Sequence, residues 1–332
     1  MNRKNICEIC TLIMGQSPDS KSYNKDKNGI PFYQGNADFG EKHPTPTVWC
    51  TAPKKIARKG DILISVRAPI GDMNIANEDC CIGRGLAAIR LNKSDIVDIN
   101  YLYHYLSATV EFLQEQGTGS TFKAINKTTL EGIEIPCPSI EKQKNIAKFI
   151  IEIKTSIQYK KAELVALNEL VKSRFIEMFG DPQNNNKQFP TKKLIDVVTL
   201  QRGHDLPVQN RDSHGSVPVY GSNGVLGFHT IAKCDRGIIT GRSGTIGEVY
   251  VSEEPFWPLN TTLYSNNTHG NNLIYLKYLL MFFNLKRFKS GAGVPTLNRN
   301  EFHGKEIMDV PIELQNEFAD FVKLIDKSKF VG

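Results

Sequence analysis

Two stretches of the sequence, "IEKQKNIAKF" from Ile140 to Phe149 and "IELQNEFADF" from Ile312 to Phe321, carry the same phrase. Both begin Ile-Glu-x-Gln, place Ala and Phe at matching offsets, and follow a proline by one or two residues. A phrase from the middle of a 332-residue chain thus returns near its end. A repeat on this scale determines the fold, because each copy is expected to form its own unit of structure.

Five further pairs of stretches match in the same order along the chain. The offset between partners falls from 188 to 172 residues, as loops of different length would produce. Six ordered matches predict a tandem duplication. The further pairs are "TLIMG" (Thr11–Gly15) with "TLQRG" (Thr199–Gly203), "GIPFYQGN" (Gly29–Asn36) with "GSVPVYGSN" (Gly215–Asn223), "VRAPIG" (Val66–Gly71) with "GRSGTIG" (Gly241–Gly247), "YLYHYL" (Tyr101–Leu106) with "YLKYLL" (Tyr275–Leu280), and, at an offset of 174, "GTGSTFKAIN" (Gly117–Asn126) with "GAGVPTLNRN" (Gly291–Asn300).

Each copy has the same expected layout. Short β-branched or aromatic runs broken by Gly, Pro and Asn come first and predict strands. An amphipathic helix follows, near 100–116 in the first copy and 273–289 in the second, and then a glycine-rich loop and a short strand. The predicted fold class is α+β, with two pseudo-symmetric units of mixed α/β type built around antiparallel strands. The expected divisions are 1–138, 139–180, 181–310 and 311–332.

A long helix is expected between the copies. Residues 139–179 contain neither Pro nor Gly, and Gly180 then supplies a stop. About 40 residues at about 1.5 Å each make a rod near 60 Å long. Apolar residues recur in steps of three and four, interrupted by Lys160 and Arg174, which predicts a coiled-coil helix that packs on a partner. This predicted packing face comprises Ile146, Ile150, Ile153, Ile157, Leu164, Leu167, Val171 and Met178.

The composition favours a soluble protein of the cytoplasm. Hydrophobic residues make up 40% and charged residues 23% of the chain, which is ordinary for globular domains. No apolar run approaches the roughly 18–20 residues of a membrane span, and the start lacks the apolar stretch of a signal peptide. Seven cysteines without an export signal indicate reduced thiols. The lone CxxC at Cys7 and Cys10 has no second pair, so no metal site is expected.

At its two domain boundaries the sequence resembles the specificity subunit of type I DNA restriction–modification enzymes. The resemblance rests on "PSIEKQ" (Pro138–Gln143) and "PIELQ" (Pro311–Gln315), on the glycine-rich loop before each, and on the overall layout. It implies two target-recognition domains, each followed by a long helix, with the two helices packed antiparallel. It also implies a non-catalytic subunit that reads a bipartite site on double-stranded DNA and recruits methyltransferase and restriction subunits.

The second long helix departs from that pattern. After Pro311 the sequence runs only to Gly332. We therefore expect a full-length antiparallel partner for the first helix to be missing from this chain, through truncation or because another chain supplies it.

Catalytic motifs that would suggest a different function are not found in the sequence. There is no GxxxxGK[ST] phosphate loop for ATP, and "GDPQNN" at Gly180 has one Pro and no aromatic where an adenine methyltransferase motif needs more. We expect no catalysis and no cofactor. Two alternatives stay open: a single-chain restriction–modification enzyme, and a duplicated protein-binding adaptor without DNA affinity.

The candidate DNA-binding residues are polar side chains in predicted turns. Arg or Lys suits guanine and phosphate, and Asn or Gln suits adenine. "GRSGTIG" and "VRAPIG" are interpreted as turns that point Arg242 or Arg67 at a phosphate, or as purely structural turns; each Asn has turn or capping bonds as its alternative. The candidates are Gln34, Asn36, Arg67, Lys123, Asn126, Asn223, Arg242, Thr296, Asn298 and Arg299. The basic runs "PKKIARKGD" and "LKRFKS" could contact phosphate or simply face solvent.

Overall fold

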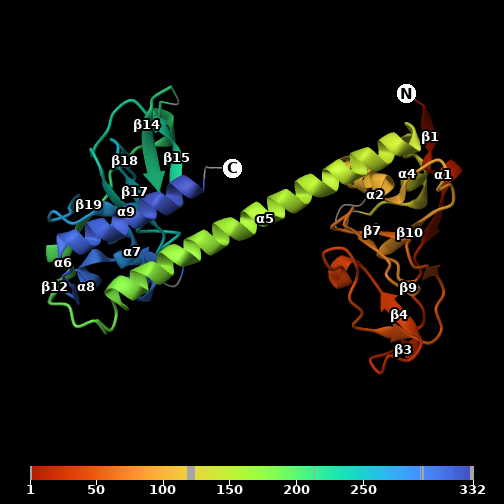
Figure 1. Ribbon diagram of the computed structural model, residues 1–332, viewed down its shortest axis with the longest axis horizontal. Helices are drawn as coiled ribbons and strands as arrows, with labels where there is room; N and C mark the ends of the chain where they lie inside the picture. The colour runs from red at the N-terminus through yellow and green to blue at the C-terminus, as the bar shows by residue number, and fades with distance from the viewer. Residues whose placement is uncertain (1, 118–123, 213, 292, 294, 330–332) are drawn as a thin grey trace. The chain divides into compact units, whose positions relative to one another are not determined.

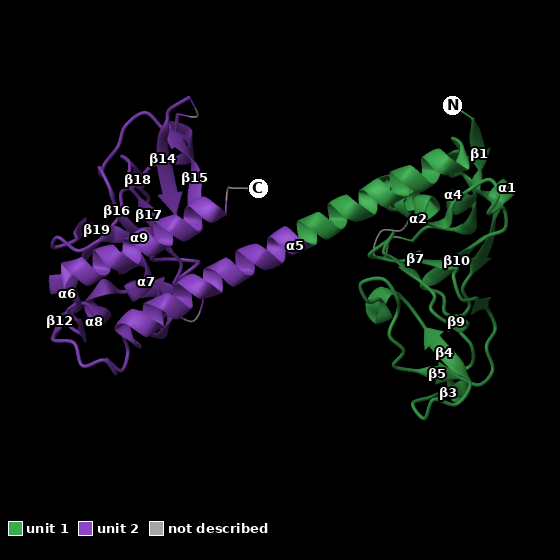
Figure 2. Cartoon of the chain, viewed as in Figure 1, with its two compact units in different colours: residues 1–158 green, residues 159–332 purple. Residues whose placement is uncertain are grey.

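A computed structural model describes residues 2–117, 124–212, 214–291, 293 and 295–329 of the chain. It divides into two compact units, residues 1–158 and 159–332 (Figure 2). Each unit contains helices and mainly antiparallel sheets, as the sequence predicts. None of the helices in the described part of the chain is long and apolar enough to span a bilayer.

The main sheet of the first unit is four-stranded and antiparallel, in the order β2-β10-β7-β8 (Figure 1). A separate two-stranded ladder pairs the first strand of the unit with its last. The bounds in the sheet are β2 (Cys10–Met14), β10 (Leu86–Leu91), β7 (Ile62–Ser65) and β8 (Met73–Ile75), and those in the ladder are β1 (Arg3–Asn5) and β11 (Glu134–Pro136).

A smaller mixed sheet has the order β3-β5-β4-β9-β6. Its β4 and β9 are parallel, and this pairing sets Tyr33 beside Ile82. Its other pairs are antiparallel. The bounds are β3 (Tyr23–Asn24), β5 (Trp49–Cys50), β4 (Ile30–Tyr33), β9 (Cys80–Ile82) and β6 (Ile56–Ala57).

Short helices and one buried cluster complete the first unit. Ile62 and Ile64 from the main sheet pack with Leu102 and Leu106 from α2 in that cluster. The helix expected over 100–116 is two helices, because Thr109 leaves helical geometry at φ −93°, ψ 2° and its hydroxyl bonds back to Leu106 O at 2.8 Å. The bounds are α1 (Ile6–Ile9), α2 (Ile99–Ala108), α3 (Val110–Glu115), α4 (Lys127–Glu131) and the 3-10 turns η1 (Ser20–Ser22) and η2 (Asn36–Asp38).

The second unit repeats this topology. Its main sheet has the order β13-β19-β16-β17, its first and last strands form a ladder, and its smaller sheet, β15-β14-β18, again contains one parallel pair. A short β20–β21 ladder is added. The strand bounds are β12 (Thr191–Lys193), β13 (Thr199–Arg202), β14 (Val217–Gly221), β15 (Gly224–His229), β16 (Gly237–Gly241), β17 (Val249–Ser252), β18 (Trp257–Pro258), β19 (Thr262–Asn267), β20 (Lys289–Ser290), β21 (Thr296–Leu297) and β22 (Glu306–Met308).

The helix expected over 273–289 also ends early. Asn284 takes the left-handed conformation at φ 57°, which ends α7, and a 3-10 turn follows. The helical bounds in this unit are α6 (Leu194–Val197), η3 (Val208–Asn210), α7 (Leu273–Phe283), η4 (Leu285–Phe288), α8 (Arg299–Phe302) and α9 (Ile312–Ser328).

Strand registers define which residues correspond between the units. Met14 pairs with Ala87 as Arg202 pairs with Leu263. The Ile125 amide bonds to Val66 O, and the Leu297 amide bonds to Arg242 O. The sequence alignment was therefore wrong at two places. Val66, not Arg67, corresponds to Arg242, and Asn126 corresponds to Asn298 rather than to Asn300.

The helix α5 (Ile140–Phe179) links the two units. Gly180 follows it at φ +74°, and its amide bonds to Ile176 O at 2.8 Å, so the predicted glycine stop is present. Ala147 is buried in the core of the first unit, and Phe175 and Phe179 are buried in that of the second.

The predicted packing face follows the helix only in part. Val171 is buried and Ile146 and Met178 are partly buried in cores, whereas Ile153, Ile157 and Leu164 are 44%, 49% and 41% exposed. Arg174, one of the predicted interruptions, pairs with Glu317 at 3.0 Å.

The repeated Gln of the opening phrase is buried at both junctions. Gln143 Oε1 accepts from the Asp98 amide at 2.9 Å, and its Nε2 donates to Ile96 O and Pro138 O. Gln315 Oε1 accepts from the Asn272 amide at 2.9 Å, and its Nε2 donates to Val310 O and Asn271 Oδ1. Because Asp98 and Asn272 cap α2 and α7, one amide fastens each boundary helix to the start of the helix within its unit.

Candidate nucleic-acid interface

In the first unit, three chain reversals meet where strands β4, β7 and β9 end. The Gly85 amide bonds to Gln34 O at 3.1 Å, and the Val66 amide bonds to Gly85 O at 2.9 Å. Arg67 then forms an isolated antiparallel β-bridge with Ala124. These backbone hydrogen bonds bring the exposed side chains of Gln34 and Arg67 to one edge of the unit.

Arg84 lies on the same edge and was missed in the sequence analysis. It is exposed between two glycines whose backbones lie against the turn after β4. A Cβ on Gly83 would lie 3.0 Å from Gln34 Cα, and one on Gly85 would lie 2.4 Å from Gln34 O. Only glycine allows this approach, and the Arg84 amide is further held by Ser17 Oγ at 3.3 Å. An arginine flanked by two glycines, "GRG", was the available signal.

The two asparagines proposed for this unit have structural bonds. Asn36 Nδ2 donates to Asp72 Oδ2 at 2.6 Å. Asn126 Oδ1 caps α4 by accepting from the Thr129 amide at 2.9 Å. The capping alternative therefore describes Asn126. Lys123 lies outside the described residues.

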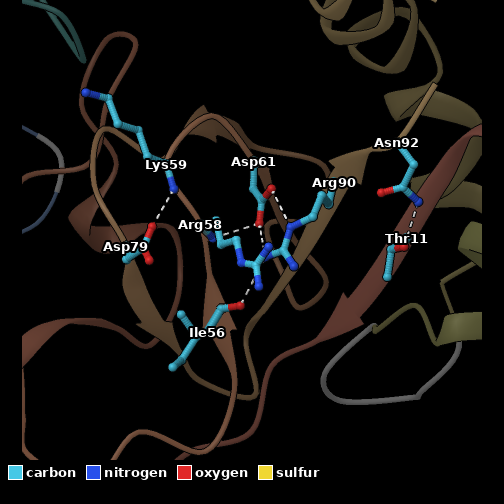
Figure 3. Close-up of polar contacts among 8 residues, drawn as sticks. All are labelled: Thr11, Ile56, Arg58, Lys59, Asp61, Asp79, Arg90 and Asn92. Carbon is cyan, nitrogen blue, oxygen red and sulfur yellow. Dashed lines mark hydrogen bonds and ion pairs between the residues drawn. The ribbon is translucent and has the colours of Figure 1, made fainter. Parts of the chain in front are cut away.

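The basic run Lys54–Lys59 is held through its backbone, and its lysine and arginine side chains are exposed. Figure 3 shows the backbone contacts at Arg58 and Lys59. Buried Asp61 forms a two-bond ion pair with Arg90 at 3.0 and 2.8 Å, and it also accepts from the Arg58 amide at 2.8 Å. The Lys59 amide bonds to Asp79 at 2.9 Å, and its side chain extends away from that carboxylate. At the other end of the run, Lys55 O accepts from the Ile82 amide, so this run begins near the edge described above.

In the second unit, the corresponding edge contains a pocket of about 270 Å³ lined by three arginines. Its floor is apolar, because Leu263 and Leu297 are buried. The remaining lining residues are Arg202, Arg242, Thr296, Asn298 and Arg299. Four of these are residues predicted from sequence, whereas Arg202 was missed.

Each arginine of this pocket is held by one bond. Arg242 Nε donates to Asn260 O at 3.0 Å. Arg299 Nη1 donates to Leu200 O at 3.4 Å. Arg202 forms an ion pair with Asp205 at 3.3 Å. Asn298 caps α8 by accepting from the Asn300 amide at 3.1 Å, so it too has the capping role.

Asn223 lies on the exposed turn between β14 and β15. That turn approaches the loop after β16, since a Cβ on Gly241 would lie 3.2 Å from Ser222 Cβ. Asn223 is therefore near the same edge as Arg242. Glycine is needed at position 241 because the Cβ of any other residue would lie 1.7 Å from Thr245 O.

The chemistry of both edges suits nucleic acid better than metal or covalent chemistry. Arginine, lysine and amide side chains dominate, and these are the groups that bind phosphates and base edges. Among the described residues no cluster of three or more His, Cys, Asp or Glu is placed to hold a metal ion, and the seven cysteines are free thiols.

Comparison with known proteins identifies the family. A family model described as the type I restriction modification DNA specificity domain matches residues 1–169 and 186–330. The chain belongs to this family. The two matched segments together cover most of both units.

Curated relatives in the specificity-domain family come from Methanocaldococcus jannaschii. The "Putative type I restriction enzyme MjaX specificity subunit" is 49% identical over 152 residues, 46% of this chain and 36% of the relative. The MjaIX type I specificity subunit is 28% identical over 279 residues, 75% of this chain and 62% of the relative. This chain thus spans between about a third and three fifths of the length of these relatives.

A solved structure confirms the fold. The S subunit of a type I restriction-modification system from M. genitalium matches 99% of this chain and 90% of its own length with a TM-score of 0.67 and 16% identity. The identity is low, so this likeness concerns the specificity-subunit fold alone.

Proposed function

We propose that this chain is the DNA-reading specificity subunit of a type I restriction–modification enzyme, and that each unit reads one half of a bipartite target. Membership in the specificity-domain family supports this. The observation that carries the proposal is the repeated topology with unlike polar side chains on matching edges. A common frame that presents different donors and acceptors suits two different half-sites.

The corresponding positions differ in the chemistry they offer to bases. Gln34 corresponds to Gly221 and Arg84 to Asn260, by the parallel registers and the amide bonds that follow them. Arginine favours guanine, and amides favour adenine. The target is therefore expected to be asymmetric.

The helix α5 is proposed to set the unread gap between the half-sites. One continuous helix of 40 residues joins the two readers, and about 10 base pairs occupy about 34 Å of duplex. The methyltransferase and restriction subunits are proposed as partners, and the exposed apolar residues of α5, such as Ile153 and Ile157, as part of the surface they or a second long helix cover.

Selection from a random duplex library by the purified full chain tests the proposal. We expect two short conserved blocks separated by unread positions, with an affinity that falls linearly on a log–log plot against salt. A continuous motif would contradict the two-reader model. No DNA binding would favour the adaptor alternative, and methyl transfer by this chain alone would favour the single-chain enzyme.

A further inference from the structure

The arginine-lined pocket of the second unit has no counterpart of the same chemistry in the described part of the first. We propose that Arg202, Arg242 and Arg299 together hold one backbone phosphate of the DNA duplex, so that the second unit anchors the complex electrostatically. This inference rests on the proposed function and assigns to the pocket of the second unit a phosphate contact that the matching positions of the first unit do not offer.

The unbonded donors of the three guanidinium groups support an anion as the occupant. Each guanidinium has five N–H donors, and each is held by a single bond, to Asn260 O, Leu200 O or Asp205. The remaining donors have no partner among the described residues. The three arginines line one pocket, so an anion bound there has donors from three separate parts of the chain close by.

The charge of the pocket is unbalanced. Its lining holds three positive groups and, within the described residues, no carboxylate. Asp205 contacts only Arg202 of the three, and its other bond is to Asn260. Leu263 and Leu297 form an apolar floor, and electrostatic attraction is stronger beside such low-dielectric material.

The size of the pocket fits a phosphate group. Its volume is about 270 Å³, whereas one water takes about 30 Å³ in the liquid. The pocket therefore has room for a phosphate group together with several waters, and phosphate matches the planar fork of arginine in two-bond contacts.

The first unit places different residues at the matching positions. Met14 corresponds to Arg202, Val66 to Arg242 and Lys127 to Arg299, by the strand registers and the amide bonds that follow them. Val66 is buried, and Lys127 is paired with Glu131 at 3.2 Å. The same frame therefore offers an apolar surface and one occupied cation where the second unit offers three arginines.

The substitution Arg202→Gln tests the proposal with little risk to folding, since Arg202 is exposed and is bonded only to Asp205 among the described residues. Arg299→Gln tests a second wall of the pocket, and Lys127→Gln is its position-matched control in the first unit. Binding of a fluorescent duplex of mixed sequence by the full chain is measured from about 0.05 to 0.3 M NaCl, with thermal unfolding as a check on each variant.

We expect each pocket variant to weaken binding about three- to tenfold at low salt and to reduce the slope of log K against log [salt] by up to about 0.9, the value for one lost phosphate contact. Lys127→Gln should leave both quantities unchanged. The preferred DNA sequence, obtained by selection from a random library, should be the same for the pocket variants and the wild type.

Three results would overturn the assignment, and they are distinguishable. If the wild type binds DNA and the pocket variants keep its affinity and slope, the pocket holds no phosphate although the proposed function stands. If the selected motif changes at one position, the pocket reads a base edge, guanine being the fit for arginine. If the wild type fails to bind any duplex, both the pocket assignment and the proposed function are wrong.

Discussion

At each junction between a unit and its following helix, one primary amide makes three hydrogen bonds in a buried site. Gln143 and Gln315 each need an oxygen that accepts from a helix cap and an NH₂ that donates twice. Glutamine is the side chain of this length that offers both. This requirement is the physical reason that Ile-Glu-x-Gln returns.

Gln143→Leu should therefore destabilise the first unit by about 3 kcal/mol, because it leaves a buried N–H and two carbonyls without partners. Chemical unfolding of the full chain measures the loss, with Lys144→Ala as the matched control on the exposed face of the same turn. Equal stability of Gln143→Leu and the control would show that the amide is dispensable.

His303 is expected to make the stability of the second unit depend on pH. It is buried and its Nε2 accepts from the Leu200 amide at 3.2 Å. Burial, with the nearby positive charge of Arg299, lowers the pKa of His303 below its usual value of 6.5. The unfolded state therefore binds a proton more readily than the native state. The contribution of neutral His303 to stability is thus expected to be full above about pH 6.5 and to be lost as pH falls towards the native pKa.

His303→Gln keeps an acceptor for the Leu200 amide and removes the titration. We expect the fall in the free energy of unfolding below pH 6.5 to be smaller in this variant than in the wild type. Burial and Lys154 also lower the pKa of His104, so only the difference between the two proteins is informative. Identical pH profiles would contradict a role for His303.

Among the elements, the extent of α5 was predictable, and its contacts with the two units were predictable only in part. Forty residues free of Pro and Gly, followed by Gly180, specify a helix through local preferences alone. Which residues of α5 are buried depends on the unit that packs against each end of the helix. A 3.5-residue pattern drifts relative to a straight helix of 3.6 residues per turn, and in the second unit Phe175 and Phe179 are buried where the heptad pattern selected Met178.

Some of the candidate DNA-binding side chains could be predicted from the repeat and others could not. Arg242, Thr296, Asn298 and Arg299 could be found because they lie in loops that the repeat marks. Arg84 and Arg202 could not be found by comparing the copies, since they correspond to Asn260 and Met14. The positions of insertions and deletions in the loops cannot be determined from one sequence. For this reason the alignment matched Arg67 with Arg242 and Asn126 with Asn300.

Phe175→Ala should cost the second unit about 3–5 kcal/mol, since a fully buried ring is removed from the core. Ile157→Ala, on the same helix but 49% exposed, should change stability by no more than about 0.5 kcal/mol. Chemical unfolding of the two variants compares them directly. A large loss from Ile157→Ala would mean that this side chain is buried in solution, as contact with another molecule would require.

For the whole molecule, the two-reader proposal predicts that the units are separable in specificity. Replacing residues 190–310 by the recognition domain of another family member should change one half-site and leave the other half-site and the gap unchanged. Library selection with the chimera gives the answer. A change in both blocks would contradict the assignment of one unit to one half-site.

Insertion of seven residues near Lys160 tests the role of α5. One heptad lengthens a helix by about 10.5 Å, so we expect a changed gap or loss of binding to the interrupted target. Each half-site should keep its own sequence. An unchanged gap at full affinity would show that the helix does not set the spacing.

The ladders that join the first and last strands of each unit have a consequence for inheritance. Because β1 pairs with β11, and β12 with β22, the chain enters and leaves each unit at neighbouring points. A glutamine that donates to the backbone carbonyl five residues before it follows each exit. A foreign unit inserted into the gene would need to match the rest of the chain only at these two paired strands. If each unit reads one half-site as proposed, recombination at two short segments would change one half of the DNA target without changing α5 or the other unit.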